Sequence, residues 1–254
     1  MTDPTTTTTE ITATAFWQEA TSGGPATSKA IRAAWEFCKA HREQLLTMTL
    51  MISVPAVGIE YLGNQYTVAE SLERNLITGA MGILRYFIPV MVLLYLRRVL
   101  EKQGSLELPD LFRAAGSYFG KLIGSSLLAG VLLLGLFLLF IVPGIIYSVY
   151  WSFLLYTVIF RDLSGMPALN YSKELVKGNW WNTIGFSLVL GLALLVGIVA
   201  VGIIPALIIE LTTDGYTDYF VSLVSDLATV FSTIGMAAYF MQLESVVKKV
   251  EVGK

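Results

Sequence analysis

The sequence predicts an all-α integral membrane protein with six transmembrane helices. Of its 254 residues, 55% are hydrophobic and only 14% are charged, whereas soluble domains have about 25% charged residues. Several windows of about 20 residues are almost free of charge, the length that a helix needs to cross a hydrocarbon core of about 30 Å. No period-two alternation is present, so helices rather than a β-barrel must satisfy the backbone inside a membrane.

The six spans are separated by polar or proline-containing segments. Residues 1–27 are rich in threonine and are expected to form a disordered tail, with residues 28–254 forming the transmembrane domain. The tail has no basic segment followed by an apolar core, so we expect an uncleaved first span. The fifth span either ends at Ile204 or continues past Pro205 to Ile209. The spans are expected at about 45–62, 76–96, 119–142, 143–160, 181–204 and 219–243.

The positions of the basic residues predict the orientation. Fifteen of the 17 lysines and arginines flank the spans on one side, which identifies that side as cytoplasmic. Both termini are therefore expected in the cytoplasm, in a multi-pass protein of the cell's inner or plasma membrane. The opposite face is expected to carry acidic residues, namely Glu60, Glu70, Glu73, Glu210, Asp214 and Asp218.

An internal repeat groups the spans in pairs. Residues 123–134 align with residues 184–195, with seven identities in twelve positions, and a proline follows each block. Each unit is expected to contain a cytoplasmic amphipathic helix, a span outward, a turn and a span back. This predicts three hairpin units, at about 28–100, 105–162 and 164–248. The residues expected to set the turns are Pro143, Gly144 and Pro205.

Arg85 and Asp226 form the sharpest candidate site. Each is a charged residue inside an expected span, where a charge costs at least about 2.5–3.5 kcal/mol unless it is paired or faces a water-filled cavity. Both lie at similar depth in spans that run in the same direction, so an ion pair between the second and sixth spans is expected. The alternatives are a transport or gating role and no contact at all.

Small residues at helical spacing let helices approach closely in a bilayer. Five glycines at such spacing are expected to pack helices within one chain, and contact between two copies of the chain is the alternative. They are Gly116, Gly120, Gly124, Gly185 and Gly191.

Two tryptophans lie where the segment after the fourth span meets the fifth. Trp180 and Trp181, next to Asn179, are typical of an aromatic belt at the headgroup level. The alternative is a specific lipid-headgroup site formed together with Arg161, Lys173 and Lys177.

The sequence provides little for catalysis. A single cysteine and a single histidine exclude a disulfide framework and a multi-residue Cys or His metal site. No catalytic triad or nucleotide-binding loop occurs, so we expect no enzyme activity, no cofactor and no metal. The net charge of −2 does not favour nucleic acid as a partner.

Three short motifs carry a family resemblance: PGI at 143–145, ALNYS at 168–172 and KGNWW at 177–181. Together they resemble a prokaryotic group of polytopic membrane proteins related to the membrane domain of glycerophosphoryl diester phosphodiesterases, which includes the YciC-like proteins of unknown function. The resemblance covers about residues 30–248 and implies a membrane fold. Hydrolysis in such enzymes belongs to a separate soluble barrel, which we do not expect here because the chain stops at Lys254 and has one histidine.

Two functions remain open. The first is a non-enzymatic accessory or organising subunit that packs against another membrane protein and binds anionic lipid headgroups on the cytoplasmic side. The second is a transporter of a small molecule or lipid, with a path lined by Arg85 and Asp226.

Overall fold

The computed structural model describes residues 16, 18, 26–66, 71–101, 108–210 and 217–252, without the side chains of 208–210 and 248–252. All regular elements in these ranges are helices. The threonine-rich tail expected at residues 1–27 falls almost entirely outside the described residues. The elements are α2 (Thr27–Ala40), α3 (Arg42–Tyr66), α4 (Leu72–Arg85), α5 (Phe87–Leu100), α6 (Leu108–Leu139), α7 (Ile141–Tyr150), α8 (Leu154–Arg161), α9 (Met166–Val176), α10 (Trp180–Gly197), the π-helical segment η1 (Ile198–Ile203), α11 (Ile204–Glu210) and α12 (Thr217–Val252).

Six helical stretches in the described residues are long and apolar enough to cross a membrane. The prediction of an all-α chain with six such helices is therefore confirmed, and they fit a multi-pass membrane protein. Their bounds are Arg42–Tyr66, Leu72–Leu100, Leu108–Leu139, Ile141–Arg161, Trp180–Leu207 and Thr217–Val247.

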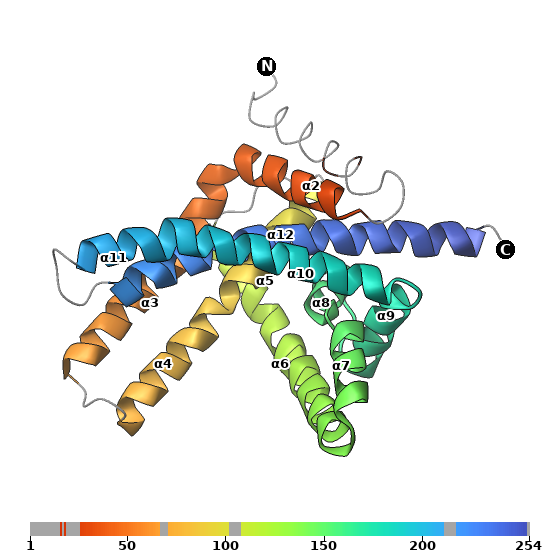
Figure 1. The fold of residues 1–254 in the computed structure, drawn as a ribbon, viewed down its shortest axis with the longest axis horizontal. Coiled ribbons are helices and arrows are strands. Elements are labelled where there is room, and N and C mark those ends of the chain that lie inside the picture. Colours follow the sequence, from red (N-terminus) through yellow and green to blue (C-terminus); the bar gives the residue numbers. More distant parts are fainter. Residues whose placement is uncertain are drawn as a thin grey trace.

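Helices that follow one another lie side by side. The helix α3 contacts α4, α6 contacts α7, and α11 contacts α12. Figure 1 shows that these pairs diverge: α3 and α4 extend to the lower left, α6 and α7 to the lower right, and α12 crosses the width of the molecule. The helix α5 lies where they meet. It is buried on all sides, as expected of a helix that is apolar all round, and Val90, Val92, Leu93 and Leu96 have no exposed surface.

Proline interrupts the second span. The helices α4 and α5 are separated at Tyr86, three residues before Pro89. Proline has no N–H to donate, and its ring clashes with the carbonyl four residues earlier, which here belongs to Arg85. Arg85 therefore lies at the end of α4 and next to a break in the span.

The fourth span is also interrupted. The helices α7 and α8 are separated at residues 151–153, and Ser172 of α9 binds the freed backbone groups. Its Oγ accepts from the Phe153 N–H at 3.3 Å and donates to the Tyr150 carbonyl at 2.7 Å. A side chain from outside the span thus replaces hydrogen bonds that the break removes.

The two expected proline turns behave differently. The helix α6 ends at Leu139, Phe140 is extended, and Pro143 lies in the first turn of α7, where proline is tolerated. Gly144 faces α6 so closely that a Cβ would lie 2.5 Å from the Phe137 ring. This part of the chain turns where the sequence predicted.

The turn expected at Pro205 is wrong. Pro205 lies inside a continuous helical path from α10 through η1 into α11, as in the alternative in which the fifth span continues past it. The π-helical segment ends at Ile203, two residues before Pro205, and a π-bulge changes the hydrogen-bonding partners where proline removes one. The helix α11 extends to Glu210 and contacts α12.

The amphipathic helices expected before each pair of spans are only partly separate elements. The helices α2 and α9 are distinct, but the segment that begins near Pro109 is continuous with α6. No residue between 109 and 139 breaks the hydrogen bonding, so this segment is the first part of a 32-residue helix. The helix α2 packs on α12 through the buried residues Ala30, Ala33, Ala34 and Phe37.

Candidate functional site

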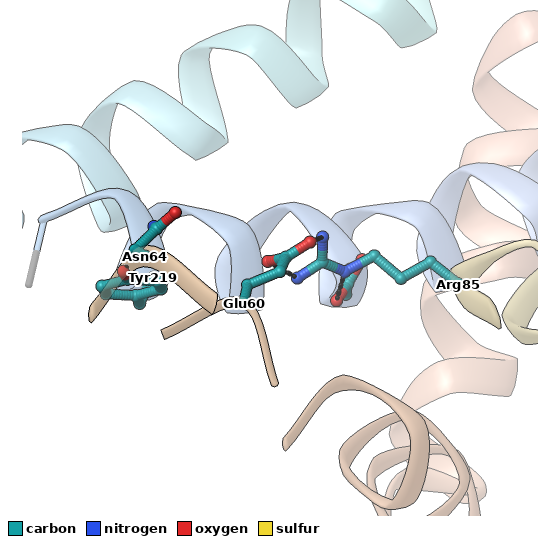
Figure 2. A network of polar contacts seen from close by, with 5 residues as sticks. Glu60, Asn64, Arg85 and Tyr219 are labelled. Atoms are coloured by element: carbon teal, nitrogen blue, oxygen red, sulfur yellow. Dashed lines mark hydrogen bonds and ion pairs between the residues drawn. The ribbon is translucent and has the colours of Figure 1, made fainter. Parts of the chain in front are cut away.

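A cluster of three charged side chains connects α3, α4 and α12. Arg85 donates from Nη1 to Glu60 Oε1 at 2.8 Å and from Nη2 to Glu60 Oε2 at 2.9 Å. Figure 2 shows the extended Arg85 side chain reaching the Glu60 carboxylate. This two-pronged geometry is the strongest that an arginine and a carboxylate form, so Glu60 is the main partner of Arg85.

Asp226 of α12 completes the cluster. Its Oδ2 lies 3.3 Å from Arg85 Nε, yet neither atom makes an aligned hydrogen bond. The contact is therefore an electrostatic attraction without the directional bond that Glu60 receives. The structure brings Arg85 and Asp226 together as the sequence predicted. It adds Glu60, which lies closer than Arg85 to the loop that connects α3 with α4.

Glu60 was expected on the outer face and not in this cluster. The helix α3 runs to Tyr66, so Glu60 lies six residues inside its end, about 9 Å along the axis. Arg85 extends toward the same end because helical side chains lean toward the N-terminus of their helix. The position of Glu60 before the end of the expected first span, 45–62, was the signal that pointed to it.

A polar contact continues the cluster toward the helix ends. Asn64 Nδ2 donates to the Tyr219 hydroxyl at 2.7 Å, and both are seen beside Glu60 in Figure 2. The rings of Tyr61 and Tyr219 meet edge to face at 5.6 Å. These contacts join α3 to α12 on the loop side of the charges.

A second ionic cluster joins α8, α9 and α12. Arg161 donates from Nε to Glu244 Oε1 at 2.6 Å and from Nη2 to Oε2, and the Tyr171 hydroxyl donates to Oε1. Burial, and next the hydrogen bond to Glu244, raise the pKa of Tyr171 to about 12. The phenol therefore stays protonated and remains a donor. The cluster borders a pocket of about 130 Å³ lined by Arg97, Leu100, Glu101, Phe160, Arg161, Phe240, Met241 and Glu244.

The residues expected to form a lipid-headgroup site engage in separate contacts. Arg161 is bound to Glu244, Lys173 Nζ lies 5.2 Å above the Tyr147 ring, and Lys177 lies 3.6 Å from Glu174. These contacts do not form one shared headgroup site. The interpretation of Trp180 and Trp181 as part of an aromatic belt stays a prediction.

The tryptophan pair lies at the start of α10. Trp180 Nε1 donates to the Ile146 carbonyl of α7 at 3.3 Å, and Trp181 is 78% exposed. Asn179 occupies the N-cap position without a side-chain capping bond. Trp180 thus anchors α10 to α7, while Trp181 faces outward.

The five glycines expected to pack helices within the chain do not do so. A Cβ at Gly116, Gly120, Gly124, Gly185 or Gly191 would find nothing within 4 Å. The inward face of α6 is instead formed by Leu111, Ala115, Leu122, Ser125 and Ala129. The expectation of packing inside one chain is therefore wrong for these positions in the described structure.

His41 is a buried polar residue at the joint of α2 and α3. Its Nδ1 lies 2.8 Å from the Tyr95 hydroxyl, its ring packs on Phe37 at 4.4 Å, and its Nε2 has no hydrogen-bond partner among the described residues. Burial lowers the pKa of His41 from 6.5 to about 4. The imidazole is therefore neutral at pH 7.

This burial predicts a pH dependence of stability. Between about pH 6.5 and 4 the unfolded chain binds a proton at His41 and the folded chain does not, so the free energy of unfolding falls as the pH falls through this window. We expect a loss of about 1–3 kcal/mol by pH 4. Thermal melting across this range should show the loss in the wild type and a smaller one in His41→Gln. Equal pH profiles would contradict the assignment.

Comparison with known proteins gives one family. A model described as "Domain of unknown function (DUF7847)" matches residues 67–247, which is more than half of the chain. The chain belongs to this family. The DUF7847 segment contains Arg85, Asp226 and the Arg161–Glu244 pair, and Glu60 lies before it. No curated protein and no solved structure matches the chain.

The DUF7847 match agrees with the expectation of a family of unknown function. It does not show the expected relation to the membrane domain of glycerophosphoryl diester phosphodiesterases, which stays a prediction.

Proposed function

We propose that this chain is a non-enzymatic integral membrane protein that organises or supports another membrane protein. In this proposal the three pairs of spans are hairpins, both termini are cytoplasmic, and anionic lipid headgroups face the basic ends of the spans. The excess of lysine and arginine on that side supports the orientation. The membrane is the inner or plasma membrane of the cell.

The observation that carries the proposal is the exposure of two spans. In the most apolar part of Trp180–Leu207 only 11% of the residues are buried within the chain, and in Leu108–Leu139 only 17%. Gly202 packs on Val224, but a Cβ at Gly116, Gly120, Gly124, Gly185 or Gly191 of these spans would enter open space. Small residues on a helix surface favour contact with another helix, since they allow close backbone approach. These faces therefore suit a membrane-embedded partner.

Bulky substitutions test this use of the glycines. Replacing Gly116, Gly120 and Gly124 together with leucine places side chains in open space, and leucine has a higher helix propensity than glycine by about 0.5–1 kcal/mol. We expect the isolated chain to be as stable as the wild type while its partner is lost. Mass measurement after extraction in native lipid reads out the partner, and thermal melting reads out the fold.

Gly79→Leu on α4 is the matched control, because it also enters open space but lies on a different pair of helices. It should leave the partner bound. If the triple variant kept the partner, or if the wild type were a lone monomer, the organising role would be wrong.

One observation supports transport as a second candidate function. The second span is broken directly after Arg85, and broken spans with charged residues at membrane depth are typical of the substrate and ion sites of transporters. A lone monomer that carries a small molecule through the same native-lipid extraction would favour this function over the organising role.

A further inference from the structure

The ends of three spans enclose the pocket of about 130 Å³. Arg97, Arg161 and Glu244 border it, and each is among the last four residues of its span, the second, fourth or sixth. In a chain that crosses the membrane six times, these three spans end on the same side. The pocket therefore lies at one membrane surface, and it has room for several waters or for a small polar group.

Two arginines present unused donors at this pocket. Arg97 donates from Nε to Glu101 at 2.8 Å and from Nη1 to the Ile159 carbonyl at 2.7 Å. Arg161 donates from Nε and Nη2 to Glu244. The described part of the chain gives no hydrogen bond to Nη2 of Arg97 or to Nη1 of Arg161, and neither is a buried atom without a partner. Each guanidinium is thus held by its neighbours and keeps one accessible amino group for a ligand.

Glu101 supplies an acceptor beside these donors. Its Oε1 accepts from Arg97, whereas its Oε2 receives no hydrogen bond from the described residues, and the side chain is 39% exposed. Both oxygens of Glu244 are already occupied, by Arg161 and Tyr171. The formal charges of the two arginines and two glutamates balance. The pocket therefore suits a ligand that combines an anionic group with a hydrogen-bond donor.

The rest of the pocket is apolar. Phe160 and Phe240 stack on each other with their ring centres 5.9 Å apart, and Leu100 and Met241 complete the lining. A small ion dissolved in water gains nothing from these side chains. The glycerol and the first acyl carbons of a lipid would leave water on contact with them, which is favourable.

We propose that this pocket binds a phospholipid headgroup in which a hydrogen-bond donor follows the phosphodiester, as in phosphatidylethanolamine or phosphatidylglycerol. The phosphate oxygens accept from Arg97 Nη2 and Arg161 Nη1, since arginine is well suited to phosphate. The ammonium or hydroxyl group donates to Glu101 Oε2. Phosphatidylcholine lacks this donor, because its nitrogen carries three methyl groups. Basic pockets between membrane helices are known to bind lipid headgroups. The site rests on the proposed function only for placing these span ends at the headgroups.

Native mass spectrometry of the purified full chain tests the choice of headgroup. The chain in detergent is mixed with phosphatidylethanolamine, phosphatidylglycerol or phosphatidylcholine of the same acyl chains, and the lipid-bound fraction is measured at increasing lipid concentration. We expect the first two lipids to bind at least about tenfold more tightly than phosphatidylcholine, the size of one hydrogen bond to a charged group. Equal binding of all three lipids would overturn the proposal.

Three variants assign the contacts. Glu101→Ala removes the acceptor and should lower the binding of the first two lipids to that of phosphatidylcholine. Arg97→Gln removes a phosphate donor and should weaken all three lipids about tenfold. Arg98→Gln is the matched control, because it removes the same charge from the same end of α5 but does not line the pocket, and it should bind like the wild type.

Thermal melting shows which variants are folded. Glu101 is partly exposed at a span end, so Glu101→Ala should fold and keeps the test valid if Arg97→Gln does not. If Glu101→Ala retained the preference against phosphatidylcholine, or if Arg98→Gln weakened binding as much as Arg97→Gln, this pocket would not be the lipid site.

A soluble competitor distinguishes a lipid from a free phosphodiester. Glycerophosphoethanolamine has the headgroup of phosphatidylethanolamine without its acyl chains. We expect it to leave bound phosphatidylethanolamine in place at equal concentration, because only the lipid contacts the apolar lining. Displacement would overturn the assignment to a lipid. These measurements detect bound lipid and not a bound protein, so their failure is distinct from the failure of the organising role.

Discussion

Arg85→Gln should remove most of the folded protein from the membrane. The substitution leaves Glu60 and Asp226 facing one another, with side chains that are 14% and 11% exposed. Removing one partner of a buried ion pair costs about 3–5 kcal/mol, a large fraction of the 5–15 kcal/mol that separates folded from unfolded proteins. The amount of monodisperse protein after mild detergent extraction, together with its melting temperature, measures this loss.

Two variants show whether charge or shape causes the loss. Arg85→Lys retains the positive charge but cannot form the two-pronged bond, so it should keep an intermediate amount of folded protein. Adding Glu60→Gln to Arg85→Gln removes one of the two facing negative charges and should recover part of the loss. A double variant as unstable as Arg85→Gln alone would show that the arginine acts through packing rather than through Glu60.

The structure also changes what a charge exchange should do. Exchanging Arg85 and Asp226 would restore their mutual attraction, but the exchange also places an acidic side chain opposite Glu60. Because Glu60 receives both hydrogen bonds from Arg85, we expect the exchanged variant to recover only part of the folded protein. Full recovery would mean that Asp226, and not Glu60, is the main partner.

The sequence predicted the charged site only in part. Arg85 and Asp226 stand out because a charge in an apolar span has few stable environments. Their similar depth in the expected spans was enough to predict that the two side chains lie close together. Glu60 was missed because the expected end of the first span was placed at Leu62, whereas α3 continues to Tyr66. This error of four residues placed Glu60 two residues from the end of the helix instead of six.

The faces of the spans could not be predicted for a different reason. The helix α10 and the part of α6 after Lys121 carry no charged residue, so hydrophobic periodicity there does not distinguish an inward face from one that contacts lipid. Gly116, Gly120 and Gly124 point outward while Ala115 and Ala129 point inward, although both sets are small residues at helical spacing. Only the positions of the other helices separate them. The same limit applies to Pro205, since the sequence does not show whether a π-helical segment will accommodate a proline.

Arg161→Gln should have the second largest effect on stability. The Glu244 side chain is 7% exposed, while that of Arg161 is 35% exposed. Loss of the arginine leaves a buried carboxylate with Tyr171 as its remaining donor, whereas loss of the carboxylate leaves a cation that already reaches solvent. After allowance for this exposure we expect Arg161→Gln to cost about 2–3 kcal/mol and Glu244→Gln to cost less. Urea unfolding in detergent micelles compares the two.

The asymmetry between these variants makes the double variant informative. Arg161→Gln combined with Glu244→Gln has neither charge, and two amides can hydrogen-bond to each other, so it should be more stable than Arg161→Gln alone. Tyr171→Phe in the wild-type background removes one hydrogen bond to a charged group and should cost about 1.5–3 kcal/mol. If Arg161→Gln and Glu244→Gln were equally destabilising and their effects simply added, the two side chains would stabilise the junction of α8, α9 and α12 independently. The buried carboxylate would then not be the group that requires the arginine.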